Sequence, residues 1–335
     1  MLNRNTRIAG SLVAMIVALT AGSAIAQSLS GASEEPFKVR FTWKIKGEYA
    51  PFYVAQEKGL FAKEGLAVTM AEGAGGQAAM AALLQGQEDV VVAPGVYALS
   101  AESKGMPIKI IALYHPASPL GIFSFASNPV KVPKDLEGRK IAVSLDLFSN
   151  YMNVFCRKNG VDCDKVGRVR VNIELQQPIF ISHGVDAFGG FLDVDWQLLQ
   201  LGAKEPLTYM DLTKYGMIIP GLSVVTSDAV IQRRPQALRE FLVAVGAGVA
   251  MTRANVSEAA DILMKSWTLA PPINVVQEQI QAAIGAVPSY RNRPVGWIDV
   301  KVIEEALATL MESKEIETAK PADSYFTNAL LNEKD

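Results

Sequence analysis

Short apolar runs alternate with longer segments of helical periodicity along most of the chain. Four runs are predicted to be strands, at residues 39–43, 67–70, 89–93 and 108–114. The segments between them place apolar residues at helical spacing, at 51–63, 77–85 and 96–103. Strands and helices that alternate at this distance predict crossover connections and a mostly parallel sheet.

The same pattern starts again after residue 132. Strands are predicted at 140–144, 169–173, 185–188 and 222–226, and short helices at 150–158, 178–183 and 196–201. A run of helices follows, at 228–233, 235–255, 257–267, 273–286 and 299–313. This order predicts an α/β protein with two lobes, each a mostly parallel sheet flanked by helices.

The two predicted lobes are joined by two chain crossings. The first lobe takes residues 37–126 and 221–335, and the second takes 127–220, with crossings near 126–130 and 220–222. Two crossings make a hinge. Because ligands of open α/β sheets bind beyond the carboxyl ends of the strands, we expect a ligand between the lobes.

The first 26 residues have the three-part layout of a secretory signal peptide. Arg4 and Arg7 precede the apolar stretch 8–21, and Ala24-Ile25-Ala26 offers small residues before a cut that leaves Gln27 first. The apolar stretch is about 14 residues, shorter than the roughly 20 that span a membrane. An uncleaved anchor helix is the alternative. We expect export to the periplasm, and a disordered leader over residues 27–36.

The amino-acid composition argues against two classes of binding partner, nucleic acids and membranes. The chain is 50% hydrophobic and 20% charged, with a formal net charge of −2. It has no basic surplus for a nucleic-acid backbone. Beyond the signal, no apolar run is long enough to insert into a membrane. These features favour a globular monomer that binds neither nucleic acid nor membrane.

Cys156 and Cys163 are the two cysteines of the chain. Nearby cysteines pair readily in an oxidising compartment. Cys156 lies near the end of a predicted helix that Gly160 stops, and Cys163 follows in the turn. We expect a structural disulfide, with free thiols as the alternative.

Five segments, in order along the chain, resemble one family of solute-binding proteins. The segments are Pro51 to Leu66, Gly73 to Asp89, Val132 to Val143, Gly184 to Ala187 and Arg234 to Val245. The family serves ABC importers for alkanesulfonates, taurine, nitrate-type ligands and thiamine pyrimidine precursors. The resemblance implies a type II periplasmic binding fold with two lobes, a membrane permease and a cytoplasmic ATPase.

The loops that follow the predicted strands supply the candidate ligand-binding residues. They are Trp43, Glu48, Tyr49, Gly76, Gln77, Pro94, Tyr114, Asp146, Phe148, Ser149, Asn150, Phe188 and Trp196. The aromatic members suit a flat ring, although at least two of them are expected in the core. Glu48 could accept hydrogen bonds from ring amino groups or be solvated. Glycines and helix starts at Gln77 and Ser149 could instead hold an anion.

We therefore predict a periplasmic substrate-binding component of an ABC importer, for a small aromatic or heteroaromatic solute with or without a carboxylate. No cofactor and no metal are expected, since neither His115 nor His183 has a metal-like partner spacing. One alternative is a synthase of pyrimidine precursors on the same fold. The resemblance implies a histidine and a cysteine-rich segment for that enzyme, but Tyr49 stands at the matching position. The other alternative is a receptor for a membrane sensor kinase.

Overall fold

A computed structural model describes residues 35–143 and 147–331 of the chain. The predicted signal peptide and most of the predicted leader lie outside the described residues, as does Asp146. The residues from Glu35 onward form one unit.

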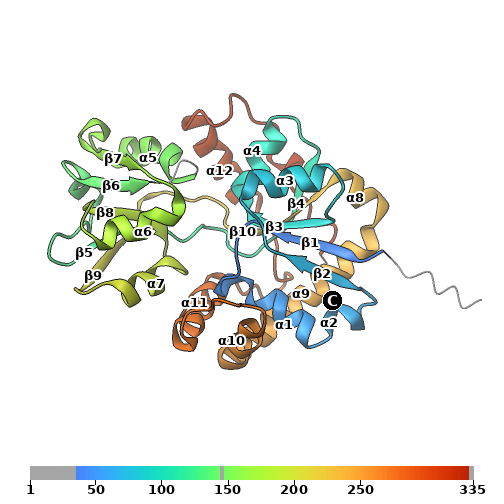
Figure 1. The fold of residues 1–335 in the computed structure, drawn as a ribbon. Coiled ribbons are helices and arrows are strands. Elements are labelled where there is room, and N and C mark those ends of the chain that lie inside the picture. Colours follow the sequence, from blue (N-terminus) through green and yellow to red (C-terminus); the bar gives the residue numbers. More distant parts are fainter. Residues whose placement is uncertain (1–34, 144–146, 332–335) are drawn as a thin grey trace, which may run out of the picture. The chain divides into compact units, whose positions relative to one another are not determined.

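The first sheet has the strand order β2-β1-β3-β10-β4 (Figure 1). Its strands are β1 (Phe37–Phe41), β2 (Val68–Ala71), β3 (Val90–Pro94), β4 (Ile108–Leu113) and β10 (Leu222–Ser227). β1 is parallel to β2 and β3, whereas β10 is antiparallel to β3 and β4. All six residues of β10 are buried, so this late strand completes the core of a sheet built mainly by the first third of the chain.

The second sheet repeats this arrangement with the order β7-β6-β8-β5-β9. Its strands are β5 (Leu120–Phe125), β6 (Lys140–Val143), β7 (Gly167–Arg170), β8 (Ala187–Phe191) and β9 (Leu207–Asp211). β6 is parallel to β7 and β8, and β5 is antiparallel to β8 and β9. In both sheets the antiparallel strand comes directly after a crossing from the other sheet.

These sheets confirm the α/β class with two sheets and correct one detail. In each sheet four strands run in the same direction, as predicted, and the strand that arrives from the other sheet inserts antiparallel to its neighbours. The first crossing lies at residues 114–119 rather than 126–130, because β5 pairs within the second sheet. The return crossing, predicted at 220–222, lies at 216–221, between η4 and β10.

Helices flank both sheets. They are α1 (Ala50–Glu57), α2 (Leu60–Lys63), α3 (Gly76–Leu84), α4 (Gly95–Ser103), α5 (Leu147–Lys158), α6 (Ile173–Ile181), α7 (Asp195–Gly202), α8 (Asp228–Arg233), α9 (Pro235–Ala254), α10 (Val256–Lys265), α11 (Ile273–Ala286) and α12 (Val300–Glu312). The helix predicted over 51–63 is two helices, because Gly59 adopts a left-handed φ of 66°. α1 packs against α9 and α10, and α11 packs against α7.

Short 3₁₀ turns complete the elements. They are η1 (Gly47–Tyr49), η2 (Pro133–Leu136), η3 (Cys163–Lys165), η4 (Leu212–Tyr215) and η5 (Ala322–Ser324). The predicted disulfide is confirmed: Cys156 near the end of α5 is bonded to Cys163 in η3, with their Cα atoms 5.6 Å apart. None of the helices in the described ranges is both long and apolar enough to cross a bilayer.

Candidate functional site

A cavity of about 580 Å³ is lined by segments from both sheets and by the C-terminal helical region. Five aromatic side chains line it: Trp43, Tyr97, Phe188, Phe191 and Trp267. Three glutamines also line it, namely Gln176, Gln177 and Gln279. The cavity therefore presents ring faces together with a few amide groups, which is the usual character of a small-molecule site.

The first sheet contributes the segments that follow β1 and β3. Residues 42–46 follow β1, and Pro94 ends β3 just before α4, which carries Tyr97. These positions obey the rule that ligands meet the carboxyl ends of strands. Gly76 opens α3 against the Tyr97 ring, where an added Cβ would lie 2.7 Å from the ring carbons. A glycine is thus required there for Tyr97 to pack.

Lys46, in the loop after β1, is a largely buried cation at the cavity. Its Nζ lies 2.6 Å from Glu48 Oε1, 5.2 Å from the centroid of the Tyr49 ring and 5.6 Å from that of Phe191. Burial alone would lower the pKa of Lys46, but the Glu48 carboxylate and its hydrogen bond outweigh burial and raise it. Lys46 is therefore a permanent charge that joins the loop after β1 to the end of β8.

The second sheet contributes β8 and the starts of α6 and α7. Asp195, the first residue of α7, accepts hydrogen bonds from the backbone N–H of Phe191 at 2.7 Å and from Gln177 Nε2 at 3.0 Å. Burial raises the pKa of Asp195, and these hydrogen bonds oppose the rise. Both carboxylate oxygens are used, so Asp195 fixes the end of β8 and the Gln177 side chain at the cavity wall.

The Gln279 side chain forms hydrogen bonds with segments on both sides of the cavity. Its side chain is fully buried on α11. Oε1 accepts the backbone N–H of Gly47 at 3.1 Å, and Nε2 donates to the Val194 carbonyl at 3.1 Å. Because one amide satisfies a backbone group from each side, Gln279 fixes the spacing of the two cavity walls in this conformation.

Two buried polar side chains at the site lack hydrogen-bond partners among the described residues. Gln176 is 3% exposed, and its Nε2 donates to nothing. Asp193 is also 3% exposed, and neither of its carboxylate oxygens accepts a hydrogen bond from another side chain or neighbouring residue. A buried group without a partner costs about 1–3 kcal/mol, so each is a group that a bound species would satisfy.

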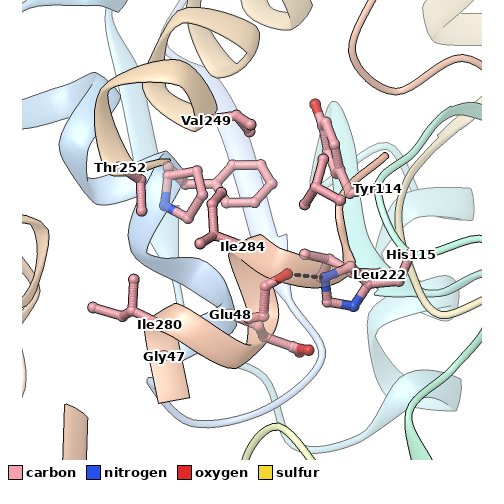
Figure 2. A pocket seen from close by; sticks show the side chains of 13 residues that line it. Gly47, Glu48, Tyr114, His115, Leu222, Val249, Thr252, Ile280 and Ile284 are labelled. Atoms are coloured by element: carbon pink, nitrogen blue, oxygen red, sulfur yellow. Dashed lines mark hydrogen bonds between the residues drawn. The ribbon is translucent and has the colours of Figure 1, made fainter. Parts of the chain in front are cut away.

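A second, much smaller space of about 10 Å³ is lined by Gly47 and Glu48, which follow the cavity-lining residues 42–46 in the chain. Figure 2 shows Glu48 and His115 side by side at one end of it, with Tyr114 nearby. His115 Nε2 lies 3.0 Å from the Ala283 carbonyl oxygen, the hydrogen bond that is dashed in the figure. Burial lowers the pKa of His115, although the Glu48 charge opposes this. The imidazole is therefore neutral at pH 7, with Nε2–H as the donor.

The structure brings together some of the predicted site residues. Trp43, Gly76, Pro94 and Phe188 line the large cavity. Glu48 lies against the small space, paired with Lys46 rather than solvated.

Other predicted residues lie elsewhere. Tyr49 is buried in the core and stacks on Phe41, with ring centroids 4.2 Å apart. Tyr114 lines only the small space, and Gln77 is exposed on α3. Trp196 packs between Phe123 and Tyr209, away from the cavity.

The remaining predicted positions lie near the start of α5. Phe148, Ser149 and Asn150 belong to the first turns of that helix, but their side chains lie outside the described part of the structure. Asp146 precedes the helix and lies outside it entirely. The predicted anion site at this helix start stays a prediction.

Several lining residues were not predicted. Tyr97, Gln176 and Gln177 point to the cavity from within helices rather than from loops, and Gln279 and Trp267 come from the C-terminal helical region. A rule that takes only the loop after each strand cannot find them. Phe191, in contrast, ends the glycine-containing strand β8, and its position at a strand end was a usable signal.

Comparison with known proteins gives the following relatives. Residues 46–259 match a family model described as NMT1/THI5 like. RibY, a riboflavin-binding protein of Chloroflexus aurantiacus, is 23% identical over 65% of this chain, and the match spans 62% of RibY's length. The 4-amino-5-hydroxymethyl-2-methylpyrimidine phosphate synthase of Legionella pneumophila is 20% identical over 67% of this chain and 71% of its own.

Among solved structures, the periplasmic aliphatic sulphonate binding protein SsuA from Escherichia coli has the same fold. Its TM-score is 0.70 at 16% sequence identity, over 87% of this chain and 92% of that chain. At this identity the likeness shows the fold alone, so the ligand must be argued from the cavity.

Proposed function

Since this chain belongs to the NMT1/THI5-like family, we propose that it is the substrate-binding component of an ABC importer for a small solute with a flat ring. The solute is aromatic or heteroaromatic. The observation that carries this proposal is a cavity lined by five aromatic side chains and by Gln176, whose buried amide nitrogen has no hydrogen-bond partner among the described residues.

The size of the cavity supports a small organic ligand. About 580 Å³ lies within the range of roughly 300–1,000 Å³ that is typical of small-molecule sites. Trp43 and Tyr97 come from the first side, and Phe188 and Phe191 from the second. Rings on opposite walls can stack on both faces of a planar ligand.

The charges of the lining disfavour a simple anion. Two lysines, Lys44 and Lys46, and two acidic residues, Glu174 and Asp195, line the cavity. Both lysines are already paired with carboxylates, at 3.2 Å and 2.6 Å. A sulfonate or nitrate would find no unpaired cation among these lining residues, so we favour a neutral ring system over a small anion.

The Gln176 side chain indicates which polar groups the ligand carries. Its Nε2 has no partner among the described residues and its side chain lines the cavity. A ligand with a ring carbonyl or ring nitrogen would satisfy the donor. Flavins and pyrimidines carry such acceptors.

The family and the predicted export support a role in transport. Ligand binding would favour the conformation in which the cavity is enclosed, and a membrane permease would recognise that state. We place the protein in the periplasm after cleavage behind Ala26, with a permease and a cytoplasmic ATPase as partners. A sensor-kinase partner is distinguished by uptake, because deletion of a transport component abolishes accumulation of the solute.

One relative is named as a synthase, so catalysis of a reaction on the bound ligand is the second candidate function. Incubation of the purified protein with a bound pyrimidine or flavin, followed by mass spectrometry, separates the two functions. A binding protein returns the ligand unchanged, whereas any time-dependent product would support the enzyme.

The primary experiment is a thermal-shift screen with flavins, pyrimidines, aromatic carboxylates, aliphatic sulfonates and nitrate. A ligand at 100 times its Kd should add about 2.7 kcal/mol to the free energy of unfolding, a clear rise in Tm. We expect the rise with ring compounds. A rise with sulfonates or nitrate only would overturn the proposal.

A matched pair of tryptophan variants locates the site. Trp43→Leu removes a ring that lines the cavity and should weaken binding of the ring compound about tenfold, or about 1.4 kcal/mol. Trp196→Phe changes a tryptophan that packs outside the cavity and should leave Kd within about twofold. Equal losses in the two variants would place the ligand elsewhere.

A further inference from the structure

Three buried side chains with metal-binding donor atoms lie close together outside the lining of the large cavity. Glu48 in η1, His115 after β4 and Asp193 after β8 each offer one donor atom, and these atoms lie within 4.8 Å of one another. All three residues are buried, at 9%, 1% and 3% exposure. Carboxylates at a protein surface gather without any ligand, but a buried group of this kind needs a physical reason.

The hydrogen bond of His115 suits a metal ligand. Nε2–H donates to the Ala283 carbonyl oxygen at 3.0 Å, so Nδ1 is the nitrogen that keeps its lone pair. Histidines that bind metals usually donate their other N–H to a carbonyl or carboxylate, which fixes the ring and its tautomer. Metal binding requires the neutral imidazole, and this hydrogen bond selects the tautomer that leaves Nδ1 free to bind.

The buried carboxylate of Asp193 is a second observation that points to a cation, and it is independent of the His115 hydrogen bond. Neither of its oxygens has a hydrogen-bond partner among the described residues. A bound cation would satisfy the carboxylate in its ionised form.

The charges around the cluster leave room for a divalent cation. Besides Glu48, the charged groups that act on Asp193 are Lys46 and Asp195. One ammonium thus faces three carboxylates, and ionisation of all three leaves two negative charges in excess. A divalent ion would balance them without displacing Lys46, because a carboxylate such as Glu48 has lone pairs for both partners.

From this geometry we infer that Glu48, His115 and Asp193 form a binding site for a divalent first-row transition metal such as Zn²⁺. One imidazole and two carboxylates are ligands that Zn²⁺ and its neighbours accept, and a soft thiolate is not needed. The ion would link the segments that follow β4 and β8, one from each sheet, and so stabilise the arrangement that Gln279 also holds. This inference replaces the expectation from sequence that the protein has no metal.

The test uses chelator-treated, purified protein and two probe ions. Isothermal titration with ZnCl₂ should show one site per chain, and CoCl₂ should give visible absorption bands of a cobalt ion bound by nitrogen and oxygen. MgCl₂ should not compete at equal concentration, because an imidazole ligand disfavours Mg²⁺. Absence of any one-to-one Zn²⁺ binding would overturn the inference.

Variants tie the binding to these residues. His115→Gln and Asp193→Asn should each weaken Zn²⁺ binding at least about tenfold and remove the cobalt bands. Asp193→Asn is the safer variant for folding, because it replaces an unpartnered carboxylate with a neutral group of the same shape. Circular dichroism and thermal melts of the metal-free variants check that each is folded.

The other histidine provides the control. His183 is exposed, lies 3.0 Å from Glu205 and is itself a place where an ion could bind at the surface. Asn tolerates its left-handed φ of 60°, so His183→Asn should fold and retain full Zn²⁺ affinity. Loss of binding in His183→Asn with retention in His115→Gln would assign the ion to the surface and refute the site. None of these readouts depends on the proposed solute.

Discussion

The two sheets share one strand order and differ in what they place at the cavity. Pro94 ends the third strand of the first sheet, and α4 follows it and presents the Tyr97 ring. At the corresponding place in the second sheet, Asp195 follows β8 and lines the cavity with its carboxylate. The shared topology therefore fixes where a site forms, and the segments at the strand ends determine its chemistry.

A second contrast lies within a single loop. Lys44 and Lys46 both follow β1 and both form ion pairs, at 3.2 Å with Glu72 and at 2.6 Å with Glu48. The Lys44 side chain is 70% exposed, whereas that of Lys46 is 17% exposed. Burial, rather than distance, should decide how much each pair contributes to stability.

The largest effect is expected from Lys46→Met, which keeps the length of the side chain and removes its charge. Glu48 would then lie buried beside Asp193 without a cation. Removal of one partner from a buried pair costs about 3–5 kcal/mol, so urea denaturation should show a loss of this size at pH 7. The double variant Lys46→Met/Glu48→Gln should recover part of that loss, because no unpaired charge remains. No recovery in the double variant would mean that Lys46 acts through packing instead.

The next largest changes in stability are expected from replacing the two aspartates that follow β8, and the two changes should have opposite signs. Asp195→Asn should destabilise the fold by about 1.5–3 kcal/mol, because an amide cannot accept from both Phe191 N–H and Gln177. Asp193→Asn should stabilise it at pH 8, because Asp193 gains no hydrogen bond from its charge. Urea midpoints of both variants, measured with a chelator present, test this difference in sign. Destabilisation of both by similar amounts would show that Asp193 has a partner that this conformation lacks.

The pH dependence of Asp193 follows from the same burial. Burial and, after it, the Glu48 charge raise its pKa from 3.8 to about 8. Between these values the folded chain holds a proton that the unfolded chain releases, so this group makes stability fall as pH rises. The slope is at most about 1.4 kcal/mol per pH unit from pH 4 to 8. In metal-free Asp193→Asn this part of the pH dependence should be absent. If the free energy of unfolding falls equally with pH in the variant and in the unaltered protein, Asp193 is not the cause.

The comparison of the sheets also shows what sequence alone can predict. The helices at 228–233 and 273–286 have the predicted bounds, because their apolar residues recur at helical spacing between clear breaks. β5 was missed because all six of its residues are buried and it lacks the alternation of a half-exposed strand. Without β5, the first crossing was placed too late in the chain.

The site was harder to predict for a related reason. Strand ends pointed to Trp43, Pro94 and Phe188, which line the cavity. Glu48, His115 and Asp193 come from three separate segments and two sheets, so no local spacing marks them as a group. Whether an aromatic residue faces the cavity or the core, as with Trp43 and Trp196, is set by packing that periodicity does not encode.

The smallest effect is expected from Lys44→Met, the exposed counterpart of Lys46→Met. Its partner Glu72 keeps a second role, because Glu72 Oε1 accepts the backbone N–H of Ile45 at 2.8 Å. The lost ion pair lies in water-exposed surroundings, where such pairs contribute about 0–1 kcal/mol. We expect a change below about 0.5 kcal/mol at 0.15 M salt, shrinking further at 1 M as the charges are screened. Urea denaturation of Lys44→Met beside Lys46→Met at both salt concentrations measures the contrast directly. A loss in Lys44→Met as large as that in Lys46→Met would mean that burial does not separate the two pairs.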